Sequence, residues 1–267
     1  MSRLEFLFAD SLGEGIVHAF TTRSGGVSEG PYASLNLTWS RGDDKDHVSE
    51  NRARVARALG VTRLVFANQV HADTVLKADG PPEGWSVGEG DALITNQSGF
   101  ALCTQVADCV PVLLHDPVNH AIAAIHSGWR STVKNITART IEAMGEVYGS
   151  RAENLRAAIG PAISKANYRV GPEVLEAFEG LFGTLDEPLI GPKDAEGGAG
   201  LDVAEAVYRQ LLSAGVAQDR ISRIRACTFA DEDRFFSSRR AARDGHAGQF
   251  GGQCGIIALK QPAGSGG

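Results

Sequence analysis

Two apolar runs in the middle of the chain constrain its fold most. Residues 101–114 and 121–126 are rich in Val, Ile, Leu and Ala, and the turn-like segment 116–119 lies between them. Apolar runs of this kind, bounded by turn residues, indicate buried strands. We therefore expect two adjacent strands, joined by a turn, inside the hydrophobic core.

Helical periodicity is clearest directly after the second run. Apolar residues within 133–148 recur at spacings of three and four, and Gly149 follows as a helix end. Two further helices are predicted, one over 48–59 that ends at Gly60 and one over 172–182. A last helix should run over 202–212, because Asp202 and Glu205 have the spacing of a capping box.

The remaining pattern mixes strands with these helices. Strands are predicted over 64–75, 155–163, 223–229 and 255–260, while 183–200 is rich in Gly and is a candidate linker; 264–267 should be frayed. Because the order shows no strict strand–helix–strand alternation, we predict an α+β fold rather than a doubly wound sheet. Neither a dinucleotide-binding glycine motif nor a Walker loop is present.

Net charge and hydropathy limit the kinds of partner that this protein can be expected to bind. The chain has 267 residues and a net charge of -6, which argues against nucleic-acid binding driven by bulk charge. It has no apolar segment of the roughly 20 residues that cross a membrane, and its beginning lacks the pattern of a signal peptide. We expect a cytoplasmic protein with no membrane partner; the oligomeric state is left open.

One cysteine and two histidines stand out as functional candidates. Four scattered cysteines are too few for a disulfide framework. Cys109 follows Asp108 among apolar residues, His71 ends the group Asn-Gln-Val-His, and His126 ends the second apolar run. Two imidazoles and a thiolate suit an open zinc site whose fourth position takes water or substrate. The other histidines are expected to be exposed or locally bonded.

The same three residues are compatible with other chemistry. Cys109 and His126 fit the nucleophile and base of a Cys/His amidohydrolase acting on peptidoglycan fragments or protein amides. Histidine and cysteine also bind copper. A non-catalytic binding or editing factor is a further class, and the residues alone leave these alternatives open.

Seven segments resemble one family in order along the chain. They are TTRSGGVSEGPYASLNL (21–37), NQVHADTV (68–75), DALIT (91–95), ADCVPVLLHDP (107–117), AAIHSGWRSTVKNI (123–136), IGPAISKANYRVG (159–171) and CTFADEDRFFSSRR (227–240). Together they closely resemble the YfiH family, long labelled multicopper polyphenol oxidase or laccase domain. The resemblance implies a single α+β domain over 1–267, with layered mixed sheets flanked by helices.

The resemblance also implies a site and an activity. The family's metal ligands match His71, Cys109 and His126, which are then also the catalytic residues. The implied metal is zinc, and the implied reaction is phosphorolysis of purine nucleosides (adenosine, inosine and methylthioadenosine), accompanied by adenosine deamination. The older copper-oxidase label fits poorly, because this chain has seven histidines and no His-x-His pair.

Phosphorolysis requires an anion pocket and contacts to the nucleoside. The candidate phosphate ligands are the arginines Arg23, Arg130, Arg239 and Arg240. The candidate nucleoside contacts are Asn36, Gln69, Tyr168 and Phe236. Asp108 is predicted either to orient a metal ligand or to bond local backbone.

The sequence departs from the family near its end. Ala247-Gly248-Gln249 stands where the family has Thr-Gly-Arg. If that arginine binds an anion in relatives, another cation must replace it here.

Overall fold

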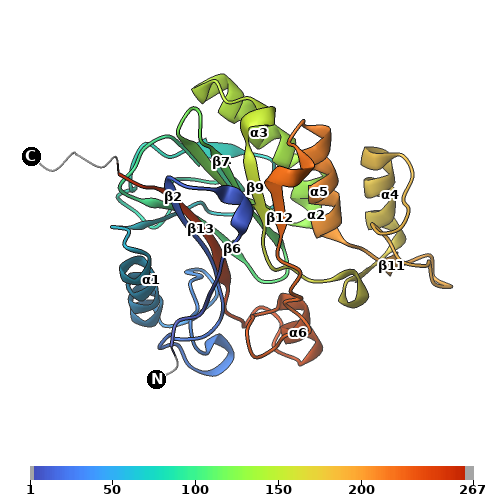
Figure 1. Cartoon of the computed structure of the whole chain (residues 1–267). Coiled ribbons are helices and arrows are strands. Elements are labelled where there is room, and N and C mark those ends of the chain that lie inside the picture. Colours follow the sequence, from blue (N-terminus) through green and yellow to red (C-terminus); the bar gives the residue numbers. More distant parts are fainter. Residues whose placement is uncertain (1–2, 262–267) are drawn as a thin grey trace, which may run out of the picture.

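Two β-sheets packed face to face form the centre of the computed structural model, which describes residues 3–261 (Figure 1). One sheet has the strand order β1-β2-β13-β6-β3 and the other has the order β12-β9-β7-β8-β5-β4. The strands of the first sheet are β1 (Phe6–Leu7), β2 (Ile16–Thr21), β13 (Gln253–Leu259), β6 (Ala101–Val106) and β3 (Leu64–Phe66). Those of the second are β12 (Ile221–Arg223), β9 (Arg156–Ile159), β7 (Val110–Asp116), β8 (Ala121–Ser127), β5 (Ala92–Thr95) and β4 (Val75–Lys77).

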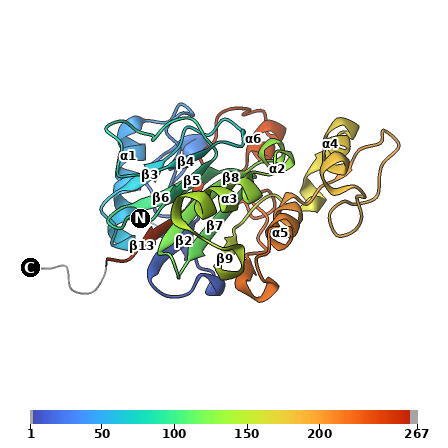
Figure 2. The same cartoon turned by 90° about the horizontal axis from the view of Figure 1, so that it is seen from above.

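Helices cover the outer face of each sheet (Figure 2). The helix α1 (Lys45–Leu59) packs on the first sheet, whereas α2 (Trp129–Val133), α3 (Ile136–Tyr148) and α5 (Val203–Ser213) pack on the second. The remaining elements are α4 (Pro172–Phe182), α6 (Ser238–Arg243) and a small sheet of β10 (Arg169–Val170) and β11 (Ala199–Gly200). Both large sheets contain parallel and antiparallel pairs. The predicted α+β class with layered mixed sheets is confirmed.

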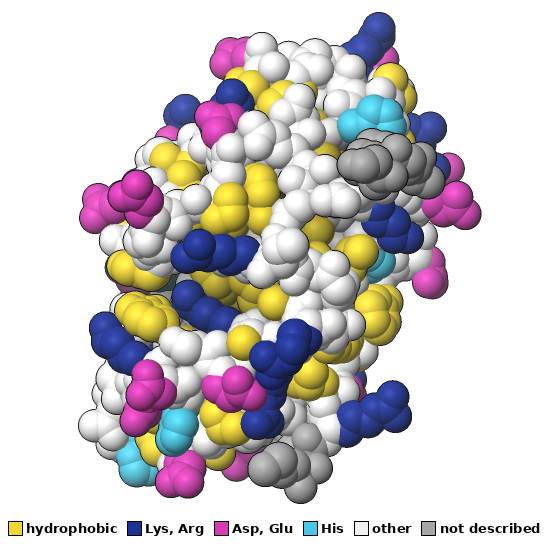
Figure 3. Space-filling model, turned by 90° about the vertical axis from the view of Figure 1, so that its left-hand side faces the viewer, with side chains coloured by type: hydrophobic (Ala, Val, Ile, Leu, Met, Phe, Trp, Pro, Cys, Tyr) yellow, Lys and Arg dark blue, Asp and Glu magenta, His cyan; other side chains and the backbone are white. Residues whose placement is uncertain are grey.

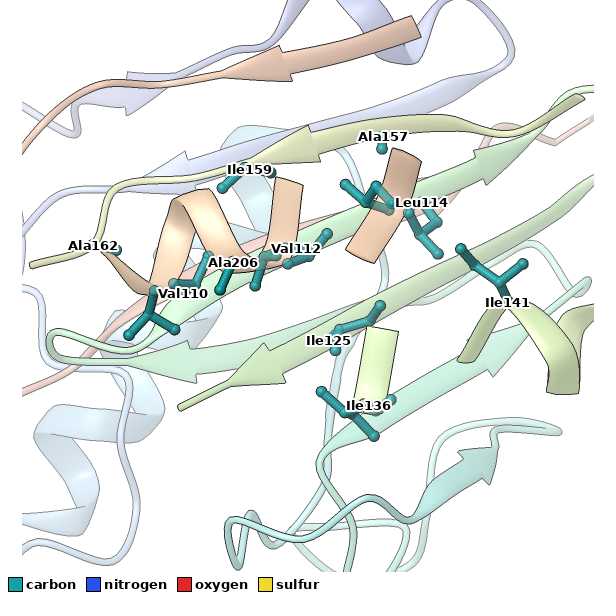
Figure 4. Close-up of a cluster of buried hydrophobic side chains, with 14 of the residues drawn as sticks. Val110, Val112, Leu114, Ile125, Ile136, Ile141, Ala157, Ile159, Ala162 and Ala206 are labelled. Carbon is teal, nitrogen blue, oxygen red and sulfur yellow. The ribbon is translucent and has the colours of Figure 1, made fainter. Parts of the chain in front are cut away.

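The middle position of the second sheet explains the long apolar runs. Every residue of β7 and β8 is buried, because one face of the sheet meets helices and the other meets the first sheet. Val112 and Ile125 pack towards α3 and α5 (Figure 4), while Leu113 packs with Phe20 between the sheets. A strand covered on both faces loses the alternation of polar and apolar residues.

The composition of the first apolar run, residues 101–114, predicted one strand, but the run forms two. It is interrupted at residues 107–109, so that β6 lies in one sheet and β7 in the other. Asp108 adopts a positive φ of 93° at this crossing. The backbone torsion and the bonds that hold it depend on distant residues, so hydrophobicity alone does not reveal the break.

The predicted helix over 133–148 is two helices. The chain leaves α2 at Lys134, and Asn135 takes the left-handed conformation (φ 61°) before α3 begins. Asparagine tolerates this conformation better than most residues do. The end of α3 at Gly149 is confirmed. The first predicted helix begins earlier than expected, at Lys45, because the Asp44 side chain accepts a bond from the Asp46 N–H.

Two other helices were predicted correctly from residues within or next to them. The helix α4 has the predicted bounds, and the Asp202 side chain caps α5 by accepting from the Glu205 N–H at 2.9 Å. The predicted strand over 64–75 instead forms β3 and β4 with a loop between them. The predicted strand over 155–163 is shorter, and most of 223–229 is not strand.

The segment 183–200 is a loop but not a linker. Leu189 and Ile190 are buried in the same cluster as β7 and α5, and β11 pairs with β10. One histidine also differs from expectation: His115 is buried and its Nδ1 lies 2.8 Å from the Leu12 carbonyl oxygen. The predicted frayed end, 264–267, lies outside the described residues.

Surface composition agrees with the modest net charge. On the face that carries α1, acidic and basic side chains are interspersed around a hollow where basic and hydrophobic groups meet (Figure 3). Among residues 3–261, no helix combines the length and the apolar character needed to cross a membrane.

Candidate metal centre

His71, Cys109 and His126 converge at one end of the two sheets. Each offers one donor atom, and the three atoms lie within 4.8 Å of one another. The Cys109 Sγ is 3.9 Å from the His71 Nε2, and the two imidazole rings meet edge to face with centroids 4.8 Å apart. His126 is buried, Cys109 is half-buried, and His71 is the most exposed of the three. The predicted triad is therefore one spatial cluster.

Two of the three residues are on loops rather than on strands. His71 lies between β3 and β4 with a positive φ of 59°, and Cys109 lies where the chain crosses from β6 to β7. Only His126 lies within a strand, β8. The predicted strands over 64–75 and 101–114 included His71 and Cys109, and this is wrong, because each residue lies in a loop that a buried carboxylate fixes.

Asp91 is the carboxylate that holds the histidines, and the sequence did not single it out. Its Oδ1 lies 2.7 Å from the His126 Nδ1 and accepts from the His71 N–H at 3.0 Å. Its Oδ2 accepts from the Val70 and Ala72 N–H groups. A carboxylate behind a histidine fixes the ring and leaves the other nitrogen free for a metal. Asp91 begins the DALIT segment, but in the sequence it looks like an ordinary polar residue that precedes a strand.

Asp108 performs a similar structural task for Cys109. Its carboxylate accepts from the hydroxyls of Thr228 and Ser237 and from the Arg239 N–H, at 2.7–2.9 Å. It therefore ties the crossing between the sheets to the C-terminal part of the chain. None of these bonds joins the Asp108 carboxylate to the side chain of His71, Cys109 or His126. Its three partners are distant in the sequence rather than local.

The donor set fits a zinc ion. Zn–S and Zn–N bonds at tetrahedral angles place sulfur and nitrogen about 3.6 Å apart, close to the 3.9 Å between Cys109 and His71. Because Asp91 occupies the Nδ1 of His126, the Nε2 remains for the ion. Gly128 allows this approach, since a Cβ there would lie 2.8 Å from the His71 ring and 3.0 Å from the Cys109 sulfur.

The same groups shift one another's protonation. Burial opposes ionisation of Cys109, but the neighbouring His126 and His71 outweigh it and lower the thiol pKa to about 6. Burial likewise disfavours charged His126, yet the Cys109 thiolate and Asp91 raise its pKa to about 9. For Asp91, bonds from His126 and backbone N–H groups overcome burial and lower the pKa. The metal-free centre thus favours a thiolate beside an imidazolium.

A cavity of about 450 Å³ opens over the three donor atoms. Of the candidate substrate residues, Gln69, Arg130, Tyr168 and Arg239 line it, and Arg41 was not anticipated. Its full lining is Thr38, Ser40, Arg41, Ala67, Asn68, Gln69, His71, Trp85, Gln105, Ala107, Asp108, Cys109, His126, Trp129, Arg130, Tyr168, Ser238, Arg239 and Ala242. The cavity therefore combines a soft donor cluster with three guanidinium groups and three aromatic rings.

Arginine side chains in this wall are held by aromatic rings. The guanidinium carbon of Arg130 lies 4.2 Å from the centroid of the Trp129 ring, and that of Arg239 lies 4.9 Å from Tyr168. Arg41 lies 4.0 Å from the Phe250 ring. Such stacking orients a guanidinium; Arg239 also donates one bond, from Nη1 to the Arg169 carbonyl oxygen at 3.1 Å, and its other N–H groups can bind an anion.

Four candidates lie outside the cavity lining. Arg23 and Arg240 donate to backbone carbonyl oxygens, which commits their side chains to the fold. Asn36 is buried and bonded to Asp43 and to the Gly252 N–H. Phe236 packs in a small apolar cluster near α6. The cavity therefore does not bring these four residues to the three donor atoms.

Gln69 lines the cavity, but its amide is also engaged. Its Nε2 donates to the Gln105 carbonyl oxygen at 2.7 Å, and its Oε1 accepts from the Gln105 N–H at 2.8 Å. This pair of bonds attaches the loop of His71 to the edge of β6. Gln69 therefore positions the loop that carries His71.

Comparisons with known proteins agree with this architecture. Residues 17–260 match the family model described as multi-copper polyphenol oxidoreductase laccase. A Deinococcus radiodurans protein named purine nucleoside phosphorylase is 43% identical over 251 residues, covering 93% of this chain and 91% of the relative. Escherichia coli YfiH, also named purine nucleoside phosphorylase, is 34% identical over 242 residues, covering 89% and 93%.

A solved structure shows the same fold. YlmD from Geobacillus stearothermophilus superposes with a TM-score of 0.87 at 31% identity, covering 95% of this chain and 94% of that one. The chain therefore belongs to the family described as multi-copper polyphenol oxidoreductase laccase, together with YfiH and YlmD.

Proposed function

We propose that this protein is a zinc-dependent purine nucleoside phosphorylase of the cytoplasm that also deaminates adenosine. The observation that carries the proposal is the cavity that joins His71, Cys109 and His126 to three arginines. The names of the relatives from Deinococcus radiodurans and Escherichia coli support the phosphorylase reaction. The substrates would be purine nucleosides, including inosine and methylthioadenosine, and phosphate.

Zinc suits these ligands better than a multicopper cluster does. Within residues 3–261, His71, Cys109 and His126 form the one group of donors close enough to share an ion, which is far fewer than several coppers need. When bound, zinc supplies a Lewis acid and an activated water. The protein's own residues must then bind the nucleoside and phosphate and manage the protons.

Phosphate binding is best assigned to the arginines of the cavity wall. Arg130 and Arg239 were candidates from the sequence, and Arg41 adds a third guanidinium. Arg130 lies in the five-residue helix α2 and not at the start of the long helix α3. The argument therefore rests on its guanidinium, which can form paired bonds to phosphate oxygens.

Arg41 provides a replacement for the family's missing arginine. Its guanidinium stacks on Phe250, which follows the unusual Ala247-Gly248-Gln249 segment directly. It also lines the cavity. The guanidinium of Arg41, from a different part of the chain, thus lies next to the segment that lacks the family's arginine.

Tyr168 is the candidate group for the leaving purine. Phosphorolysis breaks the bond between the ribose C1′ and the purine nitrogen and forms a C1′–O bond to phosphate, so the purine must take up a proton. A tyrosine hydroxyl is protonated at neutral pH, and burial, the main cause, raises the pKa of Tyr168 further, to about 12. It can then donate a hydrogen bond to the purine.

A Cys/His hydrolase is the second candidate. The lowered thiol pKa and the adjacent imidazolium are what a cysteine nucleophile needs. The two functions make opposite demands, because a nucleophilic thiolate must be free while a zinc ligand is occupied. Peptidoglycan editing by this route would need no zinc.

The test is to supply zinc-loaded full chain with inosine, with and without phosphate. We expect hypoxanthine and ribose 1-phosphate only when phosphate is present, and we expect adenosine to yield inosine in phosphate-free buffer. Phosphate-independent release of hypoxanthine, or turnover of amides by metal-free protein, would contradict the proposal.

A further inference from the structure

A second cavity lies between α1 and the loop that joins β4 to β5. This α1 cavity has a volume of about 380 Å³, which is in the range of small-molecule sites. Within residues 3–261, Trp85 is the one residue that lines both the α1 cavity and the cavity of the metal centre. The proposed reaction assigns no role to the α1 cavity. Its lining is Trp39, Ser49, Arg52, Ala53, Ala56, Thr62, Arg63, Leu64, Pro82, Gly84 and Trp85.

The guanidinium of Arg52, in the lining of this cavity, contacts two aromatic rings. Its carbon lies 3.8 Å from the centroid of the Phe66 ring and 5.3 Å from that of Trp39. Its Nε and Nη2 donate to the Leu37 carbonyl oxygen at 3.0 and 2.8 Å. Because the rings and the carbonyl oxygen fix the planar group, little side-chain freedom remains to be lost when a ligand binds.

One nitrogen of this guanidinium is open to a ligand. Arg52 is half-buried, and within residues 3–261 its Nη1 donates to no protein atom, unlike Nε and Nη2. Nη1 is also not among the unpaired side-chain atoms that lack accessible surface. It therefore combines free N–H groups with accessible surface, in a residue that lines the α1 cavity.

Arg52 also lacks a counter-ion. Its neighbours on α1, Arg54 and Arg57, both pair with Glu50, whereas Arg52 pairs with no carboxylate of residues 3–261. Burial, the main cause, lowers the pKa of Arg52 to about 10, and no carboxylate is among the groups that oppose this shift. A charge that loses hydration without a partner is costly, and a bound anion would offset that cost.

The rest of the lining selects a chemical class. The exposed Arg63 adds a second guanidinium, and no Asp or Glu is among the described residues of this lining. Trp39 and Trp85 add two indole rings, which offer flat surfaces for stacking. On the face that carries α1, basic and hydrophobic side chains indeed meet in a hollow (Figure 3). In a chain with a net charge of -6, a cavity with two cations and no acid favours an anion.

We propose that the α1 cavity binds a small organic anion with a planar aromatic ring. Its carboxylate or phosphate group accepts hydrogen bonds from the Nη1 of Arg52 and from Arg63. Its ring stacks on the indole of Trp39 or Trp85. This site requires neither the metal nor the proposed phosphorolysis.

The three tryptophans of the chain allow a direct test by NMR. Trp39 lines the α1 cavity, Trp129 lines the cavity of the metal centre, and Trp85 lines both. The probes are naphthoate and naphthyl phosphate, titrated into isotope-labelled full chain while the indole N–H signals are followed. We expect saturable shifts of Trp39 and Trp85 with at least one probe, and the tighter of the two identifies the preferred anionic group.

Two kinds of control probe separate the ring from the charge. Naphthylmethanol keeps the ring without the charge, whereas acetate and inorganic phosphate keep the charge without the ring. Each should shift Trp39 at least about tenfold more weakly, because a hydrogen bond to a charged group or a stacked ring is lost. Equal binding of naphthylmethanol, absence of saturation, or shifts of Trp129 without Trp39 would overturn the proposal.

A matched pair of variants on α1 tests the missing counter-ion. Ala53→Glu places a carboxylate in the lining beside the two arginines and should abolish saturable shifts of Trp39, because the new side chain competes with the probe. Ala58→Glu makes the same change at an exposed residue outside the lining and should leave the affinity unchanged. The same loss in both variants would mean that only overall charge matters, which contradicts a site.

Two further variants remove the cations. Arg52→Gln should lower the affinity at least about tenfold, because a hydrogen bond between charged groups is lost. Arg63→Gln, at an exposed residue that the fold can lose, should lower it about two- to fivefold. Arg57→Gln removes an exposed arginine outside the lining and should have no effect. Unchanged affinity in both folded Arg52→Gln and Arg63→Gln proteins would contradict the assignment of the anion to these two groups.

Discussion

Asp91 organises the metal centre through both oxygens of one buried carboxylate. It holds the His126 ring and the backbone of the loop that carries His71. The sequence predicts three metal ligands through their resemblance to a family, but it does not predict this residue. Its role depends on contacts between positions 20 to 35 residues apart, which only the folded chain reveals.

Asp91→Asn should lower zinc affinity about 10–100-fold, since the residue behind a ligand sets its orientation and basicity. Competition with a coloured chelator measures this affinity. The control is Asp116→Asn, another fully buried carboxylate that bonds Asn119 far from the site. We expect the control to keep its zinc affinity. Equal loss in both variants would mean that the effect is general destabilisation.

Cys109 should titrate abnormally in metal-free protein. Its pKa of about 6 means that the thiolate persists above that pH and is lost as the pH falls through it, whereas an ordinary cysteine ionises near about 8.5. Ultraviolet absorbance of the thiolate measures this in a Cys227→Ala background, because the Cys227 pKa is also lowered. Cys103 and Cys254 stay protonated, since burial raises both pKa values. A midpoint near 8.5 would contradict the described ion pair.

Arg130→Ala should separate the two proposed reactions. We expect the phosphate concentration for half-maximal phosphorolysis of inosine to rise about 10–100-fold, the cost of a lost charge-assisted bond. Adenosine deamination in phosphate-free buffer should change much less, because it uses water. Arg151→Ala, an exposed arginine paired with Glu153, is the control. Equal losses in both reactions would remove Arg130 from the phosphate site.

At the level of elements, Gly128 joins β8 to α2 directly beside the ligands. Its φ of -77° suits any residue, so only space requires glycine there. Gly128→Ala should push the new methyl group into His71 and Cys109, at a cost of about 1–3 kcal/mol, and should lower zinc content. Zinc analysis and thermal unfolding measure the two effects.

The matched control is Gly180→Ala on α4. A Cβ there meets nothing within 4 Å, and alanine favours a helix more than glycine does. We expect normal zinc content and equal or higher thermal stability. If Gly128→Ala also keeps normal zinc content, the close approach in the structure is not required for the site.

The elements also show which features the sequence could predict. The helix α4 and the cap of α5 were predicted correctly because their signals lie within a few residues. The break at Asp108 was missed because its carboxylate bonds Thr228 and Ser237, over a hundred residues away. The interruption at Asn135 was missed because the apolar spacing continues across it. Local chemistry predicts elements, whereas tertiary bonds decide where they stop.

For the whole molecule, the first and last strands of residues 3–261 lie in one sheet. The last strand, β13, lies between β2 and β6, so the C-terminal segment completes the sheet that the N-terminal segment begins (Figure 1). This pairing supports the proposal of a single domain over 1–267. The sequence predicted the class and the layers, but no pattern within it specified which strand occupies the middle of each sheet.

The metal content of the whole protein tests the central claim most directly. Elemental analysis of protein purified without chelators should give about one zinc per chain, since the described residues contain one group of suitable donors. Cys109→Ala, which removes one of three ligands, should lose that zinc, while Cys227→Ala should retain it. Stoichiometric copper in place of zinc, or full zinc content in Cys109→Ala, would contradict the account.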